Sequence, residues 1–308
     1  MGITVAHVRL LRYFSSVVQM EAARCKSLSP VVVRQEPHMH ACYSVNHMEA
    51  TDVFVADSVR LSEAPVTMAL TEAGLLVDRM EAVVNLYAEH LNWGVVKEVW
   101  HEERISARGS RASAQQILRI IKKRLQAGGS GLPSIPELAH LLDNCDTQQA
   151  KAQIFYLYFL RADPLGRYVV QELLKSQGLE RSSWDLSHRR IGKIIDDAQT
   201  RYESTLSYAA STLERWIQGL RSVFRDIGTL KGPYDEEGRV PLVESSSLHV
   251  SALYSWKQQG DNWVTLPLGW CYLFQPASDW PMLQERLLST DHWEIVQLPG
   301  RATLEPRV

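Results

Sequence analysis

A run of basic residues between positions 104 and 125 is the part of the sequence best suited to bind a charged partner. The run holds seven Lys or Arg residues and no Asp or Glu, in a chain of 308 residues whose formal net charge is only −2. Such side chains contact phosphate oxygens, which gives affinity with little choice of base sequence. One candidate partner is therefore the phosphate backbone of double-stranded DNA, and the residues that would contact it are Arg104, Arg108, Arg111, Arg119, Lys122 and Lys123.

A second, smaller basic cluster follows later in the chain. It consists of Arg189, Arg190 and Lys193. We predict that these residues make a second contact with DNA phosphates. No set of Asn, Gln and Arg side chains suited to reading base edges is evident, so we expect weak or non-specific binding to the duplex.

The first basic run has the pattern of an anchored amphipathic helix. Ser110 stands at the N-cap position, and Gly128 and Gly129 follow where the helix should end. The basic side chains fall on the outer face, because the apolar residues recur at the spacing of one buried stripe: Ala114, Ile117, Leu118, Ile121 and Leu125.

Two other interpretations of these charges stay open. Exposed helix faces are often rich in Lys and Arg for solubility alone, and Glu98, Glu102 and Glu103 lie just upstream, where they are able to pair with the cations. An acidic protein partner also suits the same charges. The residue types alone do not separate these possibilities.

Residues arranged for catalysis are not evident. The sequence has no phosphate-binding loop, dinucleotide fingerprint, nucleophile elbow or HExxH motif. The best candidate for a metal site is His38, His40 and Cys42, with His47 further on, because imidazole and thiolate bind zinc. Their spacing matches no known zinc site. We therefore expect a non-enzyme with no catalytic residue, no metal and no cofactor.

The cysteines and the hydropathy pattern predict a cytoplasmic protein. Cys25, Cys42, Cys145 and Cys271 are scattered, which argues against a disulfide framework. The most apolar run, 154–160, is far shorter than the ~20 residues that a membrane-spanning helix needs. We expect no contact with a membrane, and the oligomeric state stays open.

Helical patterns surround the basic run. A helical stripe spans residues 76–91, and several caps and stops divide the segments that follow: Thr71, the capping box Ser134–Glu137, Thr147, Asp163-Pro164 and Gly178. The aromatic run at 155–159 is predicted to be buried rather than a base-stacking surface, because no strand alternation exposes it. Short strands are predicted at Val31–Val33 and at Asp52–Leu61.

The segment after residue 180 has the order of a winged helix-turn-helix. Its long helix carries an apolar stripe from Leu206 to Ile227, with a start at Glu203-Ser204 and a stop at Gly228. A turn at Glu237-Gly238 follows in the place of a wing. Asp235, Glu236 and Glu237 make this candidate wing acidic, and phosphate would repel it.

These patterns predict a mainly α fold. We divide it into an N-terminal extension of unclear structure (1–67), a helical bundle (68–180), a winged-helix-like subdomain (181–243) and a small Trp-rich α+β cap (244–308). The cap is predicted to hold strands at 264–266 and 269–274 and a helix at 282–288.

The stretch from about Leu70 to Leu242 resembles the BrxA family, small helical proteins of BREX phage-defence systems. Four phrases carry the resemblance: Leu70-Thr-Glu-Ala-Gly-Leu-Leu76; Trp93; Arg111-Ala-Ser-Ala with Ile120-Ile-Lys-Lys-Arg124-Leu125; and Glu203-Ser-Thr-Leu206 leading to Leu220–Gly228. Residues 1–67 have no obvious counterpart in the family.

The resemblance implies two helical subdomains, the first similar to the antiterminator NusB and the second winged-helix-like. It implies DNA binding without catalysis, alongside other BREX proteins that include a methyltransferase, an ATPase and an alkaline-phosphatase-like protein. The alternatives are a scaffold whose basic face docks an acidic partner of the same system, and RNA binding, which follows from the antiterminator-like fold.

Overall fold

The computed structural model describes residues 53–63, 66, 68–71, 74–129, 131–202, 206–298 and 301–307. The predicted metal cluster at His38, His40 and Cys42 lies outside the described residues. The same holds for the predicted strand Val31–Val33 and the predicted helix start at Glu203-Ser204.

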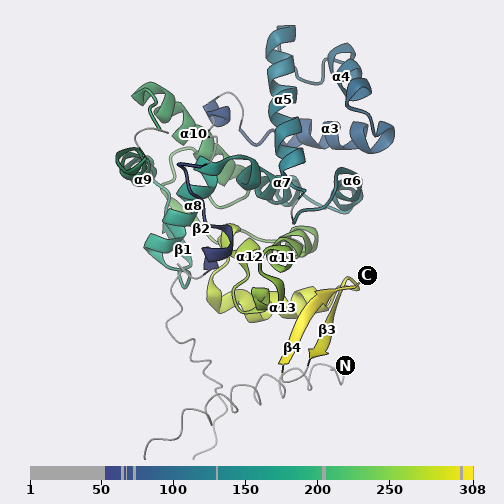
Figure 1. Cartoon of the computed structure of the whole chain (residues 1–308), viewed down its shortest axis with the longest axis vertical. Coiled ribbons are helices and arrows are strands. Elements are labelled where there is room, and N and C mark those ends of the chain that lie inside the picture. The colour runs from purple at the N-terminus through teal and green to yellow at the C-terminus, as the bar shows by residue number, and fades with distance from the viewer. Residues whose placement is uncertain are drawn as a thin grey trace, which may run out of the picture. The chain divides into compact units, whose positions relative to one another are not determined.

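The first half of the described chain is a set of packed helices. They are α3 (Val77–His90), α4 (Trp93–Glu102), α5 (Arg111–Ala127), α6 (Ile135–Asp143), α7 (Gln148–Ala162) and α8 (Pro164–Gln177). Two short 3₁₀ turns precede them, η1 (Val55–Asp57) and η2 (Ala69–Thr71). Figure 1 shows α5 running past the α3–α4 pair toward α7, on which it packs.

Most of the predicted caps are confirmed. Ser110, Thr147 and Asp163 each accept a hydrogen bond from a backbone N–H in the first turn of α5, α7 and α8. The prediction for Thr71 is wrong. Its hydroxyl donates to Met68 O within η2, and α3 begins after Leu76, which lies in the left-handed region.

A strand, two helices and a second strand follow. They are β1 (Ser183–Asp185), α9 (His188–Arg201), α10 (Ala210–Asp226) and β2 (Glu237–Arg239), and β1 pairs with β2 antiparallel. The predicted stop at Gly228 is confirmed, because this residue has a φ of 84° just after α10. However, α10 begins at Ala210, so Leu206 lies before the helix rather than in it.

The C-terminal part is more helical than its sequence indicates. It contains α11 (Ser245–Gln259), η3 (Gly260–Val264), α12 (Leu268–Tyr272), η4 (Ala277–Asp279), α13 (Trp280–Leu288), β3 (Trp293–Leu298) and β4 (Arg301–Pro306). The predicted helix at 282–288 is confirmed as part of α13. The other small sheet is formed by β3 and β4.

The predicted strands at 264–266 and 269–274 are wrong. The first stretch ends η3, and the second coincides largely with α12. Gly269 lets α12 pack directly on α11, and its N–H donates to Ser255 Oγ at 2.8 Å. A short apolar run that is buried on all sides has no periodicity that separates a strand from a helix.

The core is centred on α7. Every residue from Ala152 to Leu160 is buried, so the aromatic run belongs to the core, as predicted. Helices α3, α5, α8, α10 and α11 all pack on α7. A helix that is apolar on all sides is stable only when neighbours cover it completely, which explains the central place of α7.

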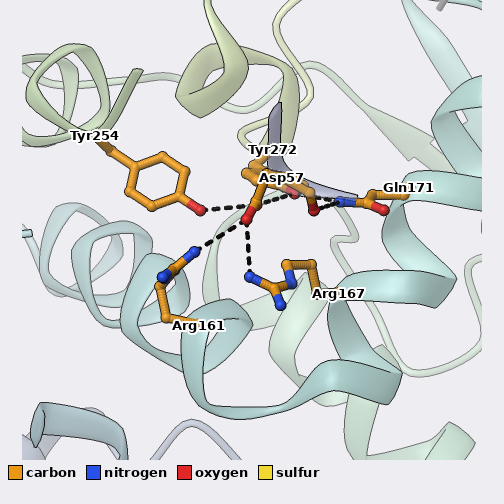
Figure 2. A network of polar contacts seen from close by, with 6 residues as sticks. All are labelled: Asp57, Arg161, Arg167, Gln171, Tyr254 and Tyr272. Carbon is orange, nitrogen blue, oxygen red and sulfur yellow. Dashed lines mark hydrogen bonds and ion pairs between the residues drawn. The ribbon is translucent and has the colours of Figure 1, made fainter. Parts of the chain in front are cut away.

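The segment that precedes α3 also enters the core. Val53, Phe54 and Leu61 are buried, and η1 replaces the strand that was predicted at Asp52–Leu61. The buried carboxylate of Asp57 accepts hydrogen bonds from helices on several sides (Figure 2). The described residues 53–61 therefore form an integral part of the helical unit.

Residues 49–296 and 303–308 belong to one compact unit. Within this unit, α11, α12 and α13 lie at the opposite end from α4 and α5 (Figure 1). The predicted domain boundaries at 67, 180 and 243 stay predictions. No helix in the described part of the chain is long and apolar enough to cross a membrane.

Candidate nucleic-acid interface

Helix α5 is anchored to the unit from its inner side. The indole N–H of Trp100 donates to Ala114 O at 3.0 Å, which ties α5 to α4. The guanidinium of Arg124 is buried and donates to Gly74 O at 2.7 Å and to Leu75 O at 3.3 Å. One of the seven basic residues of the run is therefore structural.

The outer side of α5 collects cations on one arc. Arg111, Arg119 and Lys123 are exposed and Lys122 is half-buried. At about 100° per residue, these four positions fall within an arc of roughly 120°. The apolar residues that were predicted to face inward are all buried: Ala114, Ile117, Leu118, Ile121 and Leu125.

These charges are not neutralised locally. Among the described residues, Arg111, Arg119 and Lys123 form no ion pair, and Glu98, Glu102 and Glu103 form none with them. The upstream glutamates consequently do not cancel the positive charge of this face by direct pairing.

The loop between α4 and α5 adds two exposed cations, Arg104 and Arg108. Arg104 has a φ of 54° and Ala107 a φ of 49°, and Ala107 N donates to Arg104 O at 2.9 Å in the turn between them. We call the two loop residues and the four outer residues of α5 the α5 basic surface: Arg104, Arg108, Arg111, Arg119, Lys122 and Lys123.

One cation of the α5 basic surface rests on an aromatic pair. The Nζ atom of Lys122 lies 4.8 Å from the ring centroid of Trp93, and the ring of Tyr87 lies 4.7 Å from that of Trp93. The sequence reasoning missed this contact. Tyr87 and Trp93 are six positions apart across a helix break, and only the packing of α3, α4 and α5 brings them to Lys122.

The carboxyl group of Asp163, at the junction of α7 and α8, interacts with the charges of Arg124 and Lys123 on α5. Asp163 is buried, and burial raises its pKa to about 6, although Arg124 and Lys123 act in the opposite direction. Burial also lowers the pKa of Arg124 to about 10, which leaves this side chain charged near neutral pH.

The second basic cluster lies on α9. Arg189 and Lys193 are exposed and one helical turn apart, whereas Arg190 is half-buried and donates to Ser176 Oγ at 2.5 Å. The exposed Asp196 and Asp197 follow on the next turn, so this face carries both signs of charge.

The structure places the two clusters on different parts of the unit. Helix α5 packs on α4 and α7, whereas α9 packs on α8 and α10 (Figure 1). The structure thus places Arg111, Arg119, Lys122 and Lys123 on one arc of α5, with Arg104 and Arg108 in the loop before that helix, and it holds the α9 residues on a separate element. Their predicted roles in phosphate contact stay predictions.

The loop before β2 is acidic and braced. Asp235 is held from two sides: its carboxylate accepts from Gly232 N at 2.8 Å, and its backbone O accepts from Arg221 Nη2 at 2.7 Å. Asp235, Glu236 and Glu237 are all exposed. A loop with this charge disfavours close approach of phosphate.

Comparisons with known proteins bear on the family. The family model described as BrxA matches residues 65–246, which include α3 to α10. Neither a curated protein nor a solved structure matches the chain. Since the family match extends over more than half of the sequence, the chain belongs to the BrxA family.

Proposed function

We propose that this BREX-related protein is a non-catalytic accessory protein that binds the phosphate backbone of duplex DNA through the α5 basic surface. One observation supports the proposal above all: an anchored helix holds Arg111, Arg119, Lys122 and Lys123 on one outward arc, where no ion pair within the described residues neutralises them.

The chemistry of this surface favours affinity over sequence choice. Lys and Arg side chains that contact phosphates release counterions, and the logarithm of the binding constant then falls by about 0.9 per contact for each tenfold rise in salt. The described outer side of α5 carries more cations than amide side chains, which are Gln115, Gln116 and Gln126, and Lys and Arg contacts to phosphate carry no information on base sequence. We therefore infer binding with little sequence specificity.

The second half of the matched region supports a subsidiary contact. The order β1, α9, α10, β2 with paired strands is typical of a winged-helix arrangement. Arg189 and Lys193 at the start of α9 are exposed and would supply this contact, with Arg190 limited by its bond to Ser176. The acidic residues 235–237 argue against insertion of the wing into a groove.

Fluorescence anisotropy with a labelled duplex over a series of salt concentrations tests the proposal. We expect tight binding at low salt that weakens steeply as salt rises. The double variant Arg119→Glu/Lys123→Glu should abolish most of the binding. A control of equal charge change, Arg60→Glu/Lys257→Glu, alters exposed residues elsewhere and should leave most of it.

Three outcomes contradict the proposal. They are a flat response to salt, unchanged binding by the α5 double variant, and failure to bind duplex DNA at low salt. Preferential competition by RNA would instead support RNA binding. Co-purification with an acidic BREX protein that depends on Arg119 and Lys123, without DNA binding, would support the scaffold.

A further inference from the structure

The corner between α3 and α4 presents an apolar side chain to solvent. Leu91 is 64% exposed and has a φ of 49°. This value lies in the left-handed region, which residues other than Gly, Asn and Asp rarely adopt. The left-handed conformation is that of an αL C-cap, because Leu91 ends α3, whereas the exposed leucine side chain has no corresponding role in the fold. This corner therefore invites an explanation beyond folding.

The corner is also rigid. Leu91 N donates to Tyr87 O at 2.7 Å and closes α3, and Asn92 Oδ1 accepts from Gly94 N at 2.7 Å and caps α4. The rings of Tyr87 and Trp93 pack together across the break, with centroids 4.7 Å apart. These contacts thus fix the backbone at Leu91.

The corner is continuous with the α5 basic surface. Lys122 Nζ lies 4.8 Å from the centroid of the Trp93 ring. A cation of that surface therefore contacts an aromatic ring only two positions after Leu91 in the chain. Because Lys122 lies against Trp93, a nucleic-acid backbone bound by Lys122 would pass beside this corner. Proteins that unstack and bend DNA combine cations on the backbone with an apolar wedge, often leucine, at a base step.

We propose that Leu91 is a wedge that presses into a base step of duplex DNA bound to the α5 basic surface, and thereby bends the duplex. This inference rests on the proposed DNA binding and adds the way in which the DNA is deformed. Tyr87 and Trp93 act as positioning residues that support the wedge from behind.

Förster transfer between dyes at the two ends of a short duplex tests the wedge, with anisotropy measured on the same samples. We expect the wild-type protein to bring the ends closer, as in a bend of roughly 20–90°. Leu91→Asn should still bind with the wild-type dependence on salt but lose most of the change in transfer. Asn tolerates the left-handed conformation, so unfolding does not account for such a loss.

Two further variants sharpen the result. Leu91→Met keeps an apolar wedge and should keep the bend. Leu242→Ala removes a leucine that is 73% exposed elsewhere and should also keep it. The wedge proposal is overturned if DNA bound to Leu91→Asn is bent as much as DNA bound to the wild type. It is also overturned if the wild type does not bend DNA. Both outcomes leave the proposed DNA binding intact. Absence of binding in the anisotropy overturns both proposals.

Discussion

The hydroxyl of Tyr272 donates a hydrogen bond of 2.6 Å to Oδ2 of Asp57, which lies 215 positions earlier in the chain. Arg161, Arg167 and Tyr254 bond the same carboxylate at 2.8–3.0 Å (Figure 2). This single buried group thus joins η1 to α7, α8, α11 and α12. The network connects the beginning of the described chain to the helices that follow the family match.

Replacing Asp57 should therefore destabilise the whole unit. Asp57→Asn removes the charge that balances Arg161 and Arg167, whose side chains are only 19% and 15% exposed. Breaking a buried pair in this way costs about 3–5 kcal/mol. Urea denaturation should show this loss of unfolding free energy, whereas Asp143→Asn, on the exposed end of α6, should change it by less than about 0.5 kcal/mol. Equal effects of the two variants would show that the network does not hold the fold.

The stability of the protein should decrease from pH 5 to pH 7.5 because of Asp163. Its folded pKa is raised to about 6 by burial, so its contribution is present when the group is protonated and is lost as the pH rises through 6. The full effect between the unfolded pKa of 3.8 and the folded pKa is on the order of 3 kcal/mol, and about half of it falls between pH 5 and pH 7.5. Asp163→Asn keeps a side chain able to cap α8 and removes the titration.

Denaturation of both proteins at several pH values checks this. We expect the stability of Asp163→Asn relative to the wild type to increase between pH 5 and pH 7.5. Asp226 also has a pKa raised to about 6, chiefly by burial, so Asp226→Asn serves as a separate comparison. A difference between wild type and Asp163→Asn that stays constant with pH would contradict the assignment.

Gly269→Ala should be strongly destabilising. A Cβ at this position would lie 2.1 Å from Ser251 O, and neither backbone is able to move without separating α11 from α12. Overpacking of this kind costs about 3 kcal/mol or more. Thermal denaturation should show a large decrease in Tm, while Gly109→Ala, where a Cβ meets no atom within 4 Å, should leave Tm nearly unchanged.

Two arginines on α5 should behave in opposite ways. Arg124→Met removes buried hydrogen bonds to Gly74 O and Leu75 O and should lower stability by about 1–3 kcal/mol, with no change in the salt slope of DNA binding. Arg119→Gln should leave stability unchanged and reduce that slope by about 1. The pair is measured by urea denaturation and anisotropy. If the salt slope of DNA binding changed in Arg124→Met and not in Arg119→Gln, the outer face of α5 would not be the contact surface.

The local order of the sequence determined much of the fold. Ser110, Thr147 and Asp163 cap their helices as predicted. Capping needs only a short polar side chain that accepts a hydrogen bond from a backbone N–H two or three residues later. The inner and outer faces of α5 were equally readable, since helical periodicity alone separates them. The candidate site could be predicted to this extent.

Only the tertiary structure decided the contacts between distant segments. Most of the run 269–274 is helical rather than a strand because Gly269 permits direct packing on α11, and nothing within the run specifies that neighbour. The tie of Asp57 to Tyr272, and the seat of Lys122 on Trp93, likewise require helices from separate parts of the chain to meet. Such contacts form when burial of apolar surface brings elements together. The spacing of residues within one segment does not predict which other elements will pack on it.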